Sequence, residues 1–292
     1  MRFTRYRMCI IKNESNNLEK LQLLDEKDVF NRLNLSSKIT DLIGEFAIPR
    51  CKFENHIIVG NLSQTYGIQL MKFLEDSKEE IPIMEDRAND NKTYFFINCK
   101  ENCIYIQNRK YTPKELNPNL TVTRLEQLLN KYLYHDVFET IVLRKENINY
   151  KIDELQNFFR TSYVRSVEFT NISDCKLKPG TKLHNPRIDL DDAVIESWNN
   201  YSSDNVESIK IKAKKDKSIA KNPIANIGFK LAEQNENRYE KIIKNMEVIQ
   251  GGQKEILKPI GNEYLVVPIS DKDKTTDETI DKILNHLKKR KL

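Results

Sequence analysis

Two short segments near the middle of the chain carry the residue pattern of paired β-strands. Residues 93–98 and 103–107 are rich in aromatic and β-branched side chains, and the short stretch 99–102 separates them. Such runs on either side of a turn predict a β-hairpin over 93–107. Residues 2–11, where polar and basic positions lead into an apolar end, predict a further strand.

Apolar residues recur at helical spacing in several other segments. This spacing predicts a helix-rich region over 16–47 and an amphipathic helix over 64–75. The polar segment 75–91, which contains Pro82, predicts a loop. Beyond the hairpin the pattern predicts, in order, a helix over 121–133, a strand over 137–143, a helix over 152–159 and a strand over 163–169.

The last third of the chain opens with a strict alternation of two residue types. Apolar residues occupy positions 209, 211 and 213, and lysines occupy 210, 212 and 214, which predicts a strand with one apolar and one basic face. Strands are also expected over 224–232 and 263–269. Thr275 and Glu278 match a capping box, so a final helix is predicted to begin at Thr275. Its inward-facing residues are expected to be Ile280, Ile283, Leu284 and Leu287.

These elements together predict an α+β protein with mixed, mainly antiparallel sheets and two loosely separable regions. Residues 174–191 are polar and contain Pro179, Gly180 and Pro186, so a boundary is expected there. We therefore predict an N-terminal region over 1–175 with a sensing or dimerising role. The basic C-terminal region over 190–292 is then the candidate for binding nucleic acid.

Length and cysteine content limit the classes of protein to which this chain can belong. A chain of 292 residues can form two ordinary domains. No apolar run approaches the ~20 residues that a membrane-spanning helix needs, and the N-terminus lacks the apolar stretch of a signal peptide. Five cysteines, an odd number spread over the chain, suit a reducing compartment. We therefore expect a cytoplasmic protein.

Positive charge is concentrated in the last 92 residues, which hold 19 basic and 14 acidic side chains. Lysines that neutralise phosphates release counterions, so this excess predicts binding to the backbone of double-stranded DNA. Little base readout is expected, because lysine is a point charge. The alternative is an edge strand that its lysines protect against aggregation. The candidate contacts are Lys210, Lys212, Lys214, Lys215, Lys217, Lys221, Lys288, Lys289, Arg290 and Lys291.

No recognisable catalytic or cofactor motif occurs in the sequence. The eight glycines form neither a phosphate-binding loop nor a dinucleotide fingerprint. Cys99 and Cys103 lack the second pair of ligands that a structural zinc site needs. His135 and Asp136 are neighbours in the sequence, which does not suit one residue orienting the other in a catalytic triad. No metal or cofactor is therefore predicted.

Two other functions remain open. A Mg²⁺-dependent nuclease or RNase effector would use Asp189, Asp191 and Glu207, because carboxylates hold Mg²⁺ beside a phosphate. The alternative for the acidic residues at 189–192 is to cap a helix predicted over 190–200. A non-enzymatic protein-interaction module is the third function.

The order of the predicted elements resembles that of a known group of proteins. The hairpin, helix, strand, helix and strand over 93–170, followed by the alternating segment Val206–Lys221, are similar to phage-exclusion proteins of the Rex A type. More loosely, they resemble the B component of Kiwa-type anti-phage systems. The resemblance implies a homodimeric DNA-binding sensor of infection that acts with a membrane-embedded partner. It carries no functional residue over to this sequence.

Overall fold

The computed structural model shows an α+β fold built on antiparallel sheets, as predicted. The chain divides into two compact units. The first unit comprises Met1–Glu146 and Ile269–Leu292, and the second comprises Asn147–Pro268. The structure describes residues 1–12, 18–20, 25–34, 38–41, 44–73, 80–88, 92–108, 118–133, 139–171, 196, 207–250, 253–269 and 275–290.

The second unit is therefore an insertion in the first. Its entering and leaving segments pair with each other, since Ile148 and Asn262 form an antiparallel bridge. The amide of Tyr150 also donates to the carbonyl of Pro259. The predicted boundary at 174–191 lies outside the described residues. The structure instead divides the chain at Glu146 and again at Ile269.

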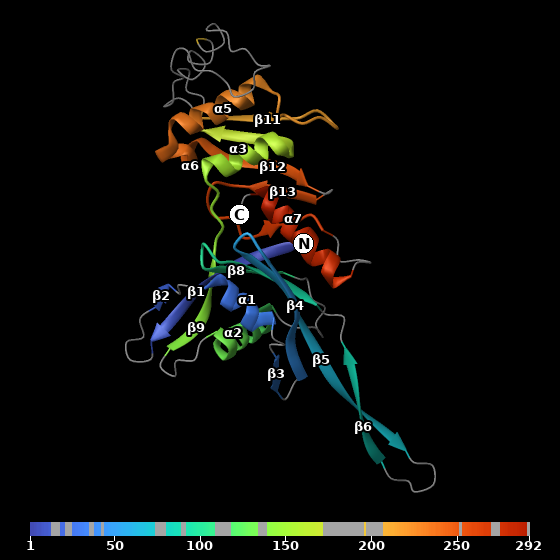
Figure 1. Cartoon of the computed structure of the whole chain (residues 1–292). Helices are drawn as coiled ribbons and strands as arrows, with labels where there is room; N and C mark the ends of the chain where they lie inside the picture. The colour runs from blue at the N-terminus through green and yellow to red at the C-terminus, as the bar shows by residue number, and fades with distance from the viewer. Residues whose placement is uncertain are drawn as a thin grey trace. The chain divides into compact units, whose positions relative to one another are not determined.

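The first unit is built on a large antiparallel sheet (Figure 1). Its neighbours run in the order β1-β8-β7-β5-β4-β3, with β2 and β9 also paired to β1, and β6 paired to β5. The bounds are β1 Arg2–Lys12, β2 Leu18–Lys20, β3 Lys38–Asp41, β4 Gly44–Glu54, β5 Ile57–Phe73, β6 Glu80–Ala88, β7 Thr93–Asn98, β8 Cys103–Gln107 and β9 Glu139–Glu146.

The predicted hairpin over 93–107 is confirmed as β7 and β8. Phe95 lies opposite Ile106, and every residue of the two strands is buried. Helices account for the burial of one face of the hairpin, the face that carries Phe95 and Ile104. Helices α1 (Glu26–Asn34) and α2 (Pro118–Leu133) pack on one face. Val29 and Leu33 of α1 and Leu125 and Leu128 of α2 share a core with the strand residues Phe46, Ile58, Phe95 and Ile104.

Helix α7 (Thr276–Arg290) packs on the opposite face, against β4 and β5. Its start matches the predicted capping box: the Glu278 amide donates to Thr275 Oγ1, and the Thr275 amide donates to the Glu278 carboxylate, each at 3.3 Å. The four residues predicted to face inward are all buried. Three ion pairs flank them, and we call this set the α7 seam. It joins Arg50 to Asp277, Lys52 to Asp281, and Glu54 to Lys288.

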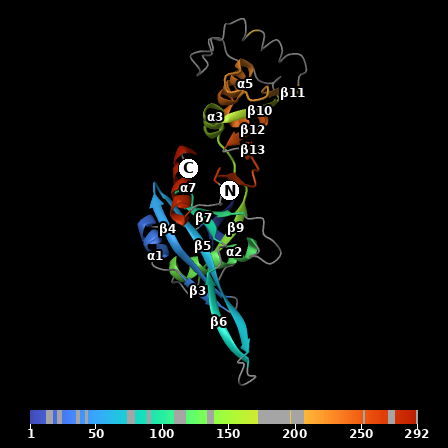
Figure 2. The same cartoon turned by 90° about the vertical axis from the view of Figure 1, so that its right-hand side faces the viewer.

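The predictions over 16–91 are largely wrong. The region 16–47 contains one described helix, α1, and otherwise the strands β2, β3 and the start of β4. The segment 64–75, predicted as a helix, continues β5, and β6 replaces much of the loop predicted over 75–91. Apolar residues at 68, 70, 71 and 73 fit helical and strand spacing alike. Pairing with β6 therefore decides the conformation, and the two strands run together away from the rest of the sheet (Figures 1 and 2).

The second unit has a four-stranded antiparallel sheet with helices against one face. Phe229 of α5 contacts Phe159 of α3 and Phe169 of β10, so these aromatic rings join the helices to the sheet. Gly228 lies directly on the Phe169 ring, where a Cβ atom would come within 2.5 Å of it. The strand order is β11-β10-β12-β13, with bounds β10 Tyr163–Thr170, β11 Ser208–Lys212, β12 Ile243–Gln250 and β13 Gln253–Leu257; the helices are α3 Ile152–Thr161, α5 Pro223–Gln234 and α6 Tyr239–Ile242.

The predictions for the second unit have mixed outcomes. The helix over 152–159 and the strands over 163–169 and 209–213 are confirmed as α3, β10 and β11. The strand predicted over 224–232 is wrong, because α5 occupies it. Asn222 caps this helix by accepting a hydrogen bond from the Ala225 amide, and Pro223 follows at its first position. The strand expected over 263–269 is reduced to β14 (Leu265–Val266).

Candidate nucleic-acid interface

The basic face predicted from the alternation of residues 209–214 is present on β11. This strand lies at one edge of the sheet and pairs with β10, with Ile209 opposite Phe169 and Ile211 opposite Val167. The two isoleucines are half-buried on the side of the helices, whereas Lys210 and Lys212 are exposed. The sheet thus separates amines from apolar side chains, as a period of two requires.

Residues 213–219 continue the basic segment, and β10 holds them in place through its backbone. Arg165 is an extra residue in β10, at a bulge between Val164 and Ser166. Its carbonyl accepts from the Ala213 amide at 2.7 Å, and its guanidinium donates to the Lys214 carbonyl at 3.2 Å. The Ile219 amide donates to the Val164 carbonyl at 3.0 Å. These bonds fix the path of the segment, so its lysines occupy defined positions.

A tight turn within this segment displays three lysines. The amide of Lys217 donates to the carbonyl of Lys214 at 3.1 Å, which closes the turn around Lys215 and Asp216. Asp216 has φ of +58°, a left-handed conformation that Asp tolerates better than most residues. Lys221 follows just before the start of α5, whose first turn carries no acidic residue. The positive end of the helix dipole therefore adds to the lysine charges.

We call the six lysines of this continuous segment the lysine strip: Lys210, Lys212, Lys214, Lys215, Lys217 and Lys221. All six are exposed. Lys210 lies 3.6 Å from Glu168, and within the part of the chain that the structure describes the other five form no ion pair. Asp216 is the single acidic residue between Ser208 and Lys221. The strip therefore carries a largely uncompensated positive charge along one edge of the second unit.

Sequence reasoning missed Glu168 and Lys244, which adjoin the strip. Lys244 is an extra residue in β12, at a bulge opposite Glu168 and Phe169. Its ammonium lies 2.7 Å from the Glu168 carboxylate. The hydrogen bond from Lys244, more than any other contact, lowers the pKa of Glu168 below its ordinary value of 4.5. Nothing local in the sequence marks a bulge, so alternation alone could not place Lys244 beside Glu168.

The predicted basic tail at 288–291 does not belong to this strip. It ends α7, in the first unit. Lys288 is paired with Glu54, and Arg290 is buried. Lys289 is exposed, and Lys291 lies outside the described residues. We therefore leave the tail out of the candidate interface, because part of its charge is already paired within the first unit.

The residues of the nuclease alternative are mostly beyond the described ranges, since Asp189 and Asp191 lie outside them. Glu207 is exposed, and its carbonyl accepts from the Asn171 amide at 3.0 Å. Across the described segments, no three His, Cys, Asp or Glu side chains are grouped to hold a metal ion. Cys99 and Cys103 are buried, and burial raises the pKa of each thiol to about 12. Such thiols stay protonated and are poor metal ligands.

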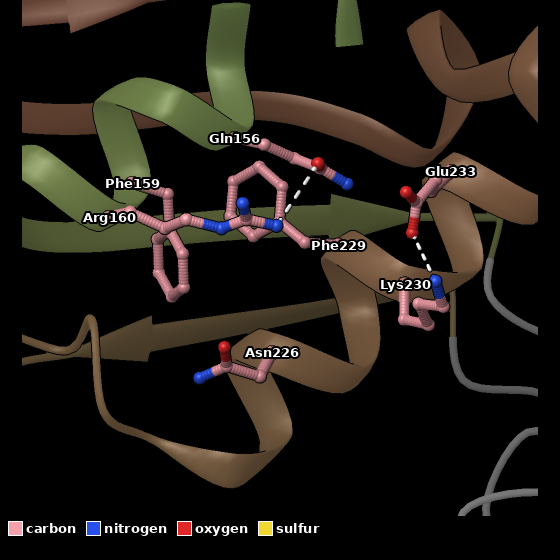
Figure 3. A pocket seen from close by; sticks show the side chains of 7 residues that line it. All are labelled: Gln156, Phe159, Arg160, Asn226, Phe229, Lys230 and Glu233. Atoms are coloured by element: carbon pink, nitrogen blue, oxygen red, sulfur yellow. Dashed lines mark hydrogen bonds and ion pairs between the residues drawn. The ribbon is translucent and has the colours of Figure 1, made fainter. Parts of the chain in front are cut away.

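A small pocket lies between α3 and α5, on the helical side of the second unit (Figure 3). Arg160 and Lys230 bring two cationic groups to it. The Lys230 ammonium lies 2.5 Å from the Glu233 carboxylate, and the Arg160 guanidinium donates to Gln156 Oε1 at 3.4 Å. Asn226 connects the pocket to the end of the basic segment by donating to the Ala220 carbonyl. Because Glu233 neutralises Lys230, the pocket attracts anions less than the lysine strip does.

No protein-family model matches this chain, and no curated protein is similar to it at a significant level. These comparisons leave the resemblance to the Rex A type as a prediction. Among the described residues, no helix is both long enough and apolar enough to cross a membrane.

Proposed function

We propose that this protein binds the phosphate backbone of double-stranded DNA, without sequence preference, through the lysine strip. One observation carries the proposal: five exposed lysines on a single fixed segment have no carboxylate partner among the described residues. Protection of an edge strand against aggregation calls for charged side chains on the strand itself. The strip extends past the strand, through a turn, to the start of a helix, and therefore exceeds that need.

The spacing of the strip suits a duplex. Lys210 and Lys212 project from alternate residues of β11, about 6.6–6.8 Å apart along the strand. Phosphates of one DNA strand advance about 3.4 Å per nucleotide along the helix axis, and the winding of the strand around that axis places neighbouring phosphates farther apart than this rise, so the two lysines can contact neighbouring phosphates. Lysine ammonium groups bind phosphates as point charges and do not read bases, so the proposed binding is independent of sequence.

The resemblance to phage-exclusion proteins extends this proposal to a biological role. In that role the protein is a cytoplasmic sensor of infection. It would bind DNA as a homodimer and act together with a membrane-embedded protein. The DNA-binding step is the part that the lysine strip supports directly, and it can be tested on the purified chain.

The test measures how the affinity for a 30-base-pair duplex falls with salt concentration. Changing Lys212, Lys215 and Lys217 to Gln removes three phosphate contacts, each of which contributes about 0.9 to the slope of log K against log salt. The slope of the variant should therefore be shallower by about 2.7 than that of the wild-type protein. Fluorescence anisotropy at several salt concentrations gives both slopes.

The matched control changes Arg50, Lys52 and Lys288 of the α7 seam to Gln. It removes the same number of positive charges, but from groups that are already paired. Its slope should equal that of the wild-type protein. If both variants lower the slope equally, net charge alone drives binding and the lysine strip is not the site. Cleavage of the duplex on adding Mg²⁺ would favour the nuclease alternative.

A further inference from the structure

Glu168 lies at the centre of a charged cluster that spans three strands of the second unit's sheet. In β11, Lys210 is directly opposite it, and in β12, Asn245 is directly opposite it on the other side. One carboxylate oxygen is 2.7 Å from the Lys244 ammonium. The other is 3.6 Å from the Lys210 ammonium and accepts from the Asn245 amide at 3.2 Å. A single carboxylate thus holds two lysines from different strands.

The carboxylate and the two ammonium groups differ in their access to solvent. The Glu168 side chain is 13% exposed, whereas those of Lys210 and Lys244 are 48% and 58% exposed. The bulge in β12 is what brings Lys244 to this side, because it adds a residue between the partners of Glu168 and Phe169. Both lysines can therefore reach a bound polyanion, while the carboxylate stays beneath them.

Two lysines around one carboxylate form an arrangement that resembles lysines around a phosphate oxygen. A phosphate approaching this face must share Lys210 and Lys244 with Glu168 or displace the carboxylate from them. The remaining lysines of the strip have no such competitor among the described residues. The negative charge of Glu168 also opposes a phosphate at short range.

We infer that Glu168 is an internal anion that competes with DNA phosphates for Lys210 and Lys244, and so sets the affinity of the lysine strip below its maximum. The inference rests on the proposed function and adds Lys244 to the interface. Glu168 is then a specificity-determining residue. It weakens binding to isolated phosphates and favours a duplex, whose dense charge engages the unpaired lysines at the same time.

The first test changes Glu168 to Gln, which keeps the shape of the side chain and removes its charge. Two freed lysines should add up to about 1.8 to the slope of log K against log salt for the 30-base-pair duplex. At about 0.1 M salt, this corresponds to binding that is about tenfold to a hundredfold tighter. Asp281→Asn is the matched control, because it removes one negative charge from the α7 seam. It should leave the slope unchanged.

A second variant does not depend on how the sheet tolerates a change at Glu168. Lys244 is exposed, so Lys244→Gln is expected to fold normally. Since Glu168 already compensates this lysine, its loss should lower the slope by clearly less than the loss of unpaired Lys215. In the Glu168→Gln background, Lys244→Gln should instead cost the full amount of about 0.9.

The outcomes separate the two proposals. If the wild-type protein does not bind the duplex, or if its slope is insensitive to the lysines at 212, 215 and 217, the proposed function fails. If binding depends on those lysines but Glu168→Gln leaves affinity and slope unchanged or lowers them, the inference about Glu168 is overturned and the function stands. Equal losses for Lys244→Gln and Lys215→Gln also overturn it.

Discussion

Strands β4 and β11 carry the same local pattern in different surroundings. Arg50 and Lys52 alternate along β4 as Lys210 and Lys212 alternate along β11, with each pair on one face of its sheet. On β4 the facing element is α7, whose aspartates neutralise both cations. On β11 one lysine shares Glu168 and the other has no described ion partner. The difference lies in what covers each face.

This comparison shows why a run of charges in a sequence does not by itself define a binding surface. The cations of the α7 seam are partly exposed, and exposed ion pairs each contribute about 0.2–1 kcal/mol to stability. Apolar residues buried beneath the seam hold the helix far more strongly. The charges of the seam are neutralised within the first unit, whereas five lysines of the strip have no ion partner among the described residues.

The largest expected effect comes from the apolar side of the seam. Leu287→Ala should lower the free energy of unfolding of the first unit by about 2–5 kcal/mol, because it leaves a cavity under α7. Urea unfolding followed by circular dichroism measures this change. Ile224→Ala is the control, since this side chain in the second unit is 45% exposed and its loss should cost less than about 0.5 kcal/mol. If folded Leu287→Ala gave a shallower slope of log K against log salt for the duplex, the packing of α7 would affect binding. This outcome would contradict the view that α7 stabilises the first unit while the lysine strip binds DNA.

A smaller effect is expected from the charged side of the same seam. Changing Arg50, Lys52 and Lys288 together to Gln should lower the free energy of unfolding by about 1 kcal/mol in total, because each exposed pair is weak. At high salt the difference in free energy of unfolding between this variant and the wild-type protein should be smaller, because salt screens the ion pairs of the wild-type protein. Urea unfolding at low and high salt tests both statements. A loss as large as that of Leu287→Ala would mean that ion pairs, and not apolar packing, hold α7.

The smallest effect concerns the pH dependence of Glu168. Its pKa is lowered in the folded protein, so its ion pairs contribute fully above the ordinary pKa of 4.5 and are lost as the pH falls through the folded value. The stability difference between the wild-type protein and Glu168→Gln should therefore shrink from about pH 6 to about pH 3. Thermal unfolding at a series of pH values measures it. A difference that is constant over this range would contradict the ion pairing.

Local signals explain which elements could be predicted from the sequence. The hairpin at 93–107, the capping box at Thr275 and the alternation at 209–213 are each decided by neighbouring residues, and all three are confirmed. The segments 16–47 and 64–75 are decided by pairing with neighbouring strands, which the spacing of apolar residues within one segment does not reveal. The start of α5 was predictable from Asn222 and Pro223, a pattern typical of a helix N-terminus.

The candidate site was predicted in part for a similar reason. The lysine strip follows from the composition of one continuous segment, and its exposure agrees with the expectation. The tail at 288–291 has a similar composition, but Glu54 lies far away in the sequence and its pairing with Lys288 depends on the fold. Glu168 and Lys244 come together only because of a bulge. Charge can be counted in a sequence, whereas its compensation is a property of the tertiary structure.

The pairing of Ile148 with Asn262 bears on the order in which the chain folds. Once the second unit has formed, Ile148 and Asn262 hold its two ends side by side. The effective loop between β9 and α7 is then much shorter than the inserted sequence. If the inserted residues were still unfolded, docking α7 would have to close a long flexible loop at an entropic cost that grows with loop length. Prior folding of the inserted unit therefore lowers the entropic cost of docking α7 on its sheet.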